Sequence, residues 1–407
     1  MMRPHCRKSA MPVLLLIVCI NFVGIGALIP ILPYTVIQTL GLPASVMTLL
    51  LASFAFAMFV ANPILGRLSD LYGRRLMLIS CLSVSVVAHS WFALSEDIIS
   101  MFVSRLIAGF AAGNTGVIQA MIADRTTPEK RAQFMGLLGA AIGVGFVAGP
   151  ALGGLLSGLG SGPMHQAPFL MAAGFSALAL VLTLRLPKAG KTGRQVEKET
   201  AVPLLTRIAA LMRSPLALYA VGSLALNFSF AQVEASFVLV LRDYLGFGAR
   251  ETGWLFTYIG VCIVIVQAVL IRPVVARFGE VGTTFLGASL LAVGQIITVM
   301  AVMGWLVGNE YPLMQTLVAT TAICFGFAFC TPAISAAVSK LANKSVMGGS
   351  LGMIQGFGSL GQVMGLTIAG PLYDLGGSQY PFGVGALVTL TLVLMVPFLA
   401  RPIDSNK

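Results

Sequence analysis

The chain alternates long stretches without charged residues with short polar segments. No Asp, Glu, Lys or Arg occurs from Ser9 to Gly66 or from Ala132 to Leu184, runs of 58 and 53 residues, and eight shorter charge-free runs follow the same pattern. A helix needs about 20 apolar residues to cross the hydrocarbon core of a bilayer. Gly/Pro breaks near 41–43 and 157–163 divide the two longest runs, so the pattern predicts twelve transmembrane helices.

The predicted spans are 11–34, 45–65, 76–95, 98–122, 132–157, 167–186, 214–241, 252–272, 281–304, 312–339, 346–373 and 379–400. Placing both termini in the cytoplasm puts 22 of the 25 Lys and Arg residues on the cytoplasmic side. Cytoplasmic loops of membrane proteins carry this excess of basic residues. The outer side keeps Arg242 and Arg250, and Arg105 falls inside a span.

A polar, charged linker divides the chain into two halves. The boundaries predict an N-terminal six-helix bundle at 1–186, a cytoplasmic linker at 187–213 and a C-terminal six-helix bundle at 214–407. The two halves are weakly similar in sequence. Segments 66–75 and 272–280 follow the second span of each half, and segments with Gly-Pro at 149–154 and 370–377 end the fifth span of each half. Matched repeats are typical of transporters that rock around a site near the bilayer midplane.

Composition excludes several other classes of protein. The chain is 57% hydrophobic and 10% charged, with a mean hydropathy of +0.93, which leaves too little polar surface for a soluble fold. The net charge of +11 is spread over short loops, so no nucleic-acid partner is expected. The six Cys show no CxxC spacing and the His are dispersed, so neither a metal, a cofactor nor an enzyme active site is expected. No small-residue cleavage site follows the first span, which favours an uncleaved helix over a signal peptide.

The loop after the second span carries a specific motif. It reads Gly66-Arg67-Leu68-Ser69-Asp70-Leu71-Tyr72-Gly73-Arg74-Arg75 and resembles the signature loop GxLaDrxGrr of the major facilitator superfamily. The glycines would permit a tight turn. The resemblance implies that Gly66, Asp70, Gly73, Arg74 and Arg75 form a conformational latch between the two halves, with Asp124 as ionic partner.

The fifth span carries a second motif, with its small residues at Gly145, Gly149, Pro150, Gly153 and Gly154. It resembles the GxxxGPxxGG motif of proton-driven exporters in that superfamily, although close packing of helices alone would also explain it. The resemblance covers nearly the whole chain and is closest to the tetracycline/proton antiporter branch of twelve-helix drug:proton antiporters. It implies the major facilitator fold, an all-α integral membrane protein of two pseudo-symmetric six-helix bundles.

The chain departs from the tetracycline exporters at the positions where they carry acidic residues or a His within spans. The matching positions here are Asn21, Ala88, an apolar stretch near Leu291, and Cys262. These departures argue against tetracycline itself as the solute.

Two ionisable residues within spans are candidates for proton coupling. A charge at the bilayer centre costs about 2.5–3.5 kcal/mol or more, so such residues are functional candidates. Glu234 is the carboxylate that lies deep inside a predicted span, and Arg105 precedes Gly109 and Gly113 at four-residue spacing, which resembles the family's RxxxG motif. A structural role stays open for each.

Polar and aromatic residues within spans could line a substrate cavity, or could instead bond neighbouring helices. Asn227, Phe230 and Glu234 share one helix face. The candidate cavity residues are Asn21, Asn114, Gln119, Asn227, Phe230, Gln232, Gln267 and Gln355. Gln295 and Gln362 are further polar residues within spans, and His89 is interpreted as a packing residue.

The preferred hypothesis is a monomeric, proton-coupled exporter of a small lipophilic or weakly cationic solute or drug, acting by alternating access. Its setting would be the inner (plasma) membrane of a bacterium, with both termini in the cytoplasm. The alternative is a proton-coupled symporter or facilitator of a metabolite or siderophore with the same fold.

Overall fold

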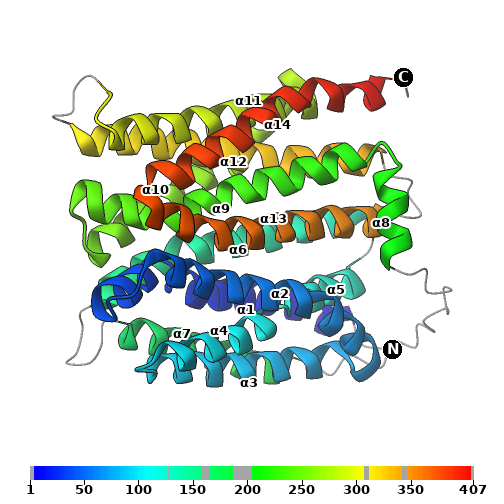
Figure 1. Cartoon of the computed structure of the whole chain (residues 1–407). Coiled ribbons are helices and arrows are strands. Elements are labelled where there is room, and N and C mark those ends of the chain that lie inside the picture. Colours follow the sequence, from blue (N-terminus) through cyan, green and yellow to red (C-terminus); the bar gives the residue numbers. More distant parts are fainter. Residues whose placement is uncertain are drawn as a thin grey trace. The chain divides into compact units, whose positions relative to one another are not determined.

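The computed structural model describes residues 4–126, 128–157, 165–186, 204–306, 311–341 and 347–404. These residues form fourteen α-helices and two short π-helices, and no strand occurs among them (Figure 1). This confirms the all-helical fold. Most of the predicted linker, 187–203, lies outside the described residues.

The chain divides into two compact units. Unit 1 contains Met1–Thr192 together with Phe247–Val261, and unit 2 contains Gly193–Gly246 and Cys262–Lys407. The tenth α-helix therefore begins in unit 1 and continues into unit 2.

Unit 1 holds seven complete α-helices around a core of aliphatic side chains. Its elements are α1 (Pro4–Gly26), η1 (Tyr34–Thr39), α2 (Ala44–Tyr72), α3 (Arg74–Ala93), α4 (Ile98–Ala112), α5 (Thr115–Arg125), α6 (Pro128–Leu156), α7 (Gln166–Leu184) and the first part of α10 (Ala249–Ile265). Helix α1 packs on α6 and α7, α2 packs on α4, and α3 packs on α4 and α7. Leu14 and Ile17 of α1 meet Leu82 of α3 and Ile118 of α5 in the buried core.

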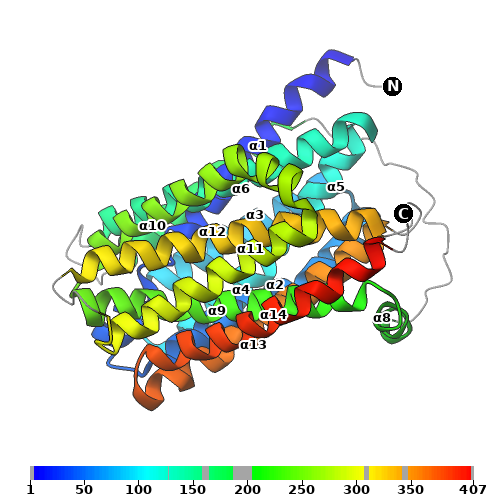
Figure 2. The same ribbon diagram turned by 90° about the horizontal axis from the view of Figure 1, so that it is seen from above.

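Unit 2 is built around α9 (Ala217–Leu245), which packs on α12, α13 and α14. Its other elements are α8 (Leu204–Met212), η2 (Val266–Leu270), α11 (Ile271–Val302), α12 (Pro312–Leu341), α13 (Met347–Gly376) and α14 (Gln379–Asp404). Helices α11 and α12 run side by side (Figure 2). Their close approach needs small residues, because a Cβ at Gly287 would lie 2.7 Å from the Gly326 carbonyl oxygen.

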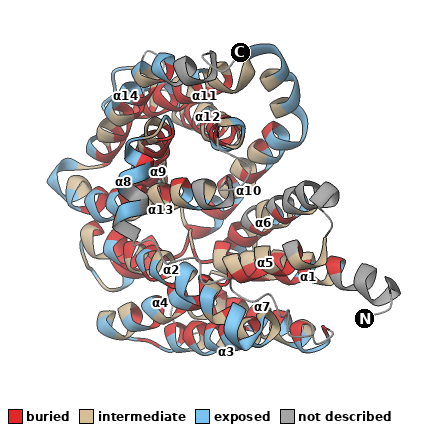
Figure 3. Ribbon diagram, turned by 90° about the vertical axis from the view of Figure 1, so that its right-hand side faces the viewer, coloured by how far each residue is buried: buried red, intermediate tan, exposed pale blue. Residues whose placement is uncertain are grey.

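Apolar side chains also cover the outer faces of the helices. On α14, Leu387, Leu390, Leu394 and Phe398 are all exposed and recur every three or four residues, which places them on one face. Figure 3 shows exposed stretches of this kind in pale blue. A continuous apolar stripe on a helix surface fits contact with lipid, and the chain is a multi-pass membrane protein.

Eight helices among the described residues are long and apolar enough to cross a membrane. One continuous stretch, Ala249–Val302, contains two predicted spans, and its backbone leaves the helical region at Gly279 (φ 68°, ψ 179°). Each of the twelve predicted spans coincides with at least one helix, consistent with the twelve-helix fold.

Several details differ from the sequence-based prediction. Helix α1 ends at Gly26 and a separate π-helix follows, whereas one span was predicted to residue 34. The fourth span is broken at Gly113 and Asn114 into α4 and α5, and the end of the predicted linker forms α8. Gly66 was predicted to permit the turn after the second span, but it lies inside α2, which continues to Tyr72.

Candidate functional site

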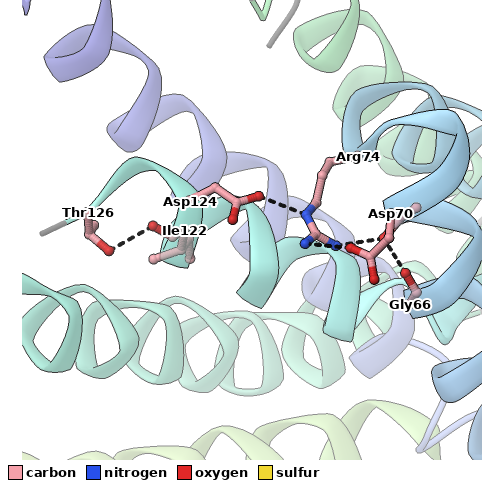
Figure 4. A network of polar contacts seen from close by, with 7 residues as sticks. Gly66, Asp70, Arg74, Ile122, Asp124 and Thr126 are labelled. Carbon is pink, nitrogen blue, oxygen red and sulfur yellow. Dashed lines mark hydrogen bonds and ion pairs between the residues drawn. The ribbon is translucent and has the colours of Figure 1, made fainter. Parts of the chain in front are cut away.

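The loop between α2 and α3 turns at a single residue, Gly73. Its φ of 99° is favourable for glycine and strained for other residues. Arg74 follows directly, and its guanidinium pairs with Asp70 at 2.7 Å and with Asp124 at 2.9 Å (Figure 4). It also donates to Ser69 Oγ at 2.8 Å. The structure therefore brings three predicted latch residues together, with Arg74 at the centre.

Arg75, also predicted in the latch, has different partners. Its Nε donates to the Thr183 carbonyl oxygen at 3.3 Å and its Nη2 to the Leu184 carbonyl oxygen at 2.5 Å. These carbonyls end α7, where a cation offsets the partial negative charge of the helix terminus. Arg75 therefore ties α3 to α7 within unit 1.

Unit 2 carries a charge-inverted counterpart of the Arg74–Asp124 pair. Gly279, with a φ of 68°, precedes Glu280 as Gly73 precedes Arg74. Lys340, near the end of α12, lies 2.5 Å from the Glu280 carboxylate. The acidic residue occupies the position that a basic residue has in unit 1. The sequence analysis matched 272–280 with the loop of unit 1 but did not pair Glu280 with Lys340.

The glycine motif of α6 packs closely against α1. A Cβ at Gly145 would lie 2.9 Å from the Cys19 carbonyl oxygen, and one at Gly149 would lie 2.6 Å from the Val23 carbonyl oxygen. A Cβ at Gly153 would overlap the Ala27 carbonyl. These three residues, spaced by four, form the face of α6 that contacts α1.

The other residues of that motif contact α10 within unit 1. A Cβ at Gly154 would lie 2.9 Å from Gly253 Cα, and a Cβ at Gly253 would lie 2.8 Å from the Pro150 carbonyl oxygen. The motif thus gives α6 two close helix contacts, which is the packing interpretation that the sequence left open.

Arg105 is buried in unit 1 between aromatic rings. The residue is 4% exposed, and its Cζ lies 4.5 Å from the ring centroid of Phe54 and 6.0 Å from that of Phe169. The spacing of Arg105 and Gly109 has a physical reason, because a Cβ at Gly109 would lie 2.9 Å from Phe54 Cα. Glycine at this position lets α2 approach α4 and brings the Phe54 ring onto the guanidinium.

These aromatic contacts do not satisfy the Arg105 guanidinium. Its Nε and Nη1 atoms are buried and have no hydrogen-bond partner among the described residues. A cation–π contact contributes about 0.5–2 kcal/mol, whereas an unpaired buried charge costs several kcal/mol. The nearby His89 has an unpaired Nε2, while its Nδ1 lies 3.4 Å from Ser176 Oγ.

His165 precedes α7, outside the membrane-spanning segments. It is 3% exposed and contacts the rings of Phe92 and Phe169 edge-on, at centroid distances of 5.8 Å and 6.4 Å. Burial lowers the pKa of His165 below its ordinary value, and the backbone of Ser95 opposes this shift. The sequence analysis did not single out this residue.

Glu234 lies on α9 in unit 2 and meets a single polar partner from α13. Gln362 donates to its carboxylate at 3.0 Å. Within the part of the chain that the structure describes, no cation pairs with Glu234. The hydrogen bond from Gln362 is therefore the polar contact that the described residues provide to this carboxylate.

Two predicted cavity residues, Asn227 and Phe230, precede Glu234 on the same helix face. Phe230 stacks on Phe327 at a centroid distance of 3.8 Å. Asn227 is only half-buried but donates to the Ser223 carbonyl oxygen at 2.8 Å, within its own helix. Its amide also limits the space at Gly358 of α13, where a Cβ would lie 2.8 Å away.

The remaining candidate cavity residues divide by burial. Gln232 is fully buried and donates to the Gly365 carbonyl oxygen at 3.0 Å, which makes it an interhelical bond between α9 and α13. Asn21 and Asn114 are buried in unit 1, and both side-chain amide atoms of Asn114 lack a hydrogen-bond partner within the described part of the chain. The other candidates are the half-buried Gln119 and the exposed Gln267 and Gln355.

A buried polar network joins three helices of unit 2. Gln295 of α11 donates to Ser229 Oγ at 2.9 Å, and Thr389 of α14 donates to Gln295 Oε1 at 3.1 Å. All three residues are fully buried. The network satisfies polar groups inside unit 2 and joins α9, α11 and α14.

Apolar spanning helices, an ion pair at a tight interhelical loop, a buried guanidinium and a half-buried carboxyl group within spans are features of a polytopic membrane transporter. Residues 14–322 and 235–407 match the sequence profile of the Major Facilitator Superfamily. The chain belongs to this superfamily and is a transporter of small molecules rather than an enzyme.

Individual relatives agree with this assignment. The chain is 30% identical to Multidrug resistance protein 1 of Bacillus subtilis (strain 168), covering 95% of each chain. It is also 30% identical to the class C tetracycline resistance protein of Escherichia coli, covering 97% of each. The crystal structure of nucleoside transporter NupG has the same fold, with a TM-score of 0.75 at 15% identity over 96% of this chain and 99% of that one.

Proposed function

We propose that this protein exports a small lipophilic or weakly cationic drug across the plasma membrane in exchange for protons. The observation that carries the proposal is the Glu234 carboxyl group, which lies within a spanning helix, accepts one hydrogen bond from Gln362 and has no cationic partner among the described residues. The names of the relatives, which are multidrug and tetracycline resistance proteins, support export as the direction.

Glu234 is proposed to exchange the coupled proton. A carboxyl group that can be neutral or charged at modest cost takes up a proton from the outside and releases it inside. A proton driven through 100 mV supplies about 2.3 kcal/mol, enough to shift a conformational equilibrium more than tenfold. Arg105 stays charged throughout, so its contribution would be a fixed positive field and not a transferred proton.

The Arg74 cluster is proposed to act as the conformational latch. Its two carboxylate partners come from α2 and from the end of α5, so one guanidinium holds three helix ends of unit 1 in register. We further propose that both termini are cytoplasmic and that the protein acts as a monomer.

Uptake into inverted membrane vesicles tests this function. With an acidic lumen, the wild-type protein should accumulate ethidium, a lipophilic cation, and Glu234→Gln should abolish the accumulation. Glu96→Gln is the matched control, because Glu96 is an exposed carboxylate outside the spans, and it should behave as the wild type. Proton-driven accumulation in right-side-out vesicles instead would refute export and favour symport.

A further inference from the structure

The surroundings of Arg105 lack the negative charge that a buried guanidinium requires. Arg105 is only 4% exposed, and within the described residues no carboxylate forms an ion pair with it. Two of its nitrogen atoms donate no hydrogen bond. A buried charge is ordinarily paired, so the site is incomplete in this structure.

The neighbours of Arg105 are aromatic and polar side chains of α2, α3 and α7. Phe54 and Phe169 place their ring faces toward the guanidinium, and Phe92 stacks on Phe169 at a centroid distance of 3.8 Å with nearly parallel planes. His89 adds an imidazole nitrogen without a partner. The side chains around Arg105 therefore combine aromatic rings with a fixed positive charge and with polar atoms that lack a hydrogen-bond partner among the described residues.

We propose that Arg105, flanked by Phe54, Phe169 and His89, binds the carboxylate of the transported solute. A guanidinium recognises a carboxylate through charge-assisted N–H···O bonds, and the half-buried Phe54 ring would contact the apolar ring system that carries it. This inference rests on the proposed function and extends it, because the transported solutes then include lipophilic acids and zwitterions beside lipophilic cations.

Binding of a matched pair of dyes to the purified protein tests the inference. Rhodamine B carries a free carboxylate, and its methyl ester has the same ring system without that charge. We expect Arg105→Gln to weaken rhodamine B binding about tenfold or more, the loss typical of one charged hydrogen bond, and to change ester binding less than about twofold. Arg105→Lys should recover part of the affinity for the acid.

Two further variants keep the test decisive. Arg250→Gln, at an exposed position, should leave both affinities unchanged. His89→Gln retains the Arg105 guanidinium and should weaken binding of rhodamine B more than binding of its methyl ester. Equal losses for both dyes in Arg105→Gln, or no loss, would overturn the inference, as would wild-type protein that does not bind rhodamine B.

The choice of membrane distinguishes a solute carboxylate from a lipid phosphate. In nanodiscs, rhodamine B affinity should be the same in phosphatidylcholine alone and in mixtures with phosphatidylglycerol. Competition by phosphatidylglycerol would assign the site to lipid and overturn the inference. Intact dye discrimination together with absent proton-driven uptake would count against the proposed function alone.

Discussion

The close packing of α6 on α1 gives a sharp test of how the glycine motif works. In Gly149→Ala, the new Cβ would lie 2.6 Å from the Val23 carbonyl oxygen and 2.8 Å from the Ala27 backbone nitrogen. Ordinary van der Waals contact begins at 3.4 Å, so the backbones must separate by roughly 0.8 Å, the difference between 3.4 and 2.6 Å. Overpacking of this kind costs about 1–3 kcal/mol.

Gly143→Ala is the matched control in the same helix. No atom lies within 4 Å of a Cβ at Gly143, and Ala is favoured over Gly inside a helix by about 0.5–1 kcal/mol. The two substitutions should therefore change stability in opposite directions. Thermal unfolding of the detergent-purified protein, followed by loss of monodisperse protein in size-exclusion chromatography, measures both.

The result that refutes this reasoning is equal stability of the two variants. A destabilised Gly149→Ala protein that also loses transport would show that close packing is required for function. If Gly149→Ala is destabilised but transports at the wild-type rate per folded molecule, the motif serves packing alone and carries no information on direction.

Three further predictions follow from the charged groups. Asp124→Asn removes one of the two carboxylates that pair with Arg74. Because charged hydrogen bonds contribute about 1.5–3 kcal/mol, thermal stability and the transport rate should both fall. A variant identical to wild type in both assays would contradict the role of Asp124. Lys340→Glu alone should slow transport through repulsion from Glu280, and the double variant with Glu280→Lys should restore the transport rate. Lys340→Glu should change the free energy of unfolding by less than about 1 kcal/mol, because Lys340 is 60% exposed. Burial lowers the pKa of His165, so the unfolded chain binds more protons than the folded protein as the pH falls through the ordinary pKa of about 6.5. Stability should therefore fall as the pH drops below about 6.5, and an unchanged pH profile in His165→Gln would show that another group titrates.

The twelve spans could be predicted from the sequence because lipid imposes one length and one composition on every crossing helix. The positions of the breaks within helices could not be predicted. Gly66 and Gly73 are both glycines in a polar loop, yet only Gly73 adopts positive φ, because α2 continues in helical geometry to Tyr72. The need for glycine at position 113 comes from the neighbouring helix α2, because a Cβ at Gly113 would lie 2.6 Å from the Ala61 Cβ.

In the candidate site, too, the features set within one helix could be predicted, and the contacts between segments distant in sequence could not. Helical periodicity placed Asn227, Phe230 and Glu234 on one face, and burial costs singled out Arg105 and Glu234. The partners of these groups come from distant segments, Gln362 for Glu234 and Phe54 and Phe169 for Arg105. Periodicity within one helix carries no information about such contacts, so a single sequence did not reveal them.

The coupling of protons to solute through Glu234 can be measured directly in proteoliposomes. Addition of ethidium should dissipate an imposed pH gradient with the wild-type protein and not with Glu234→Gln, while exchange of labelled for unlabelled ethidium without a gradient should persist in that variant. Proton movement of wild-type size in Glu234→Gln would contradict the account.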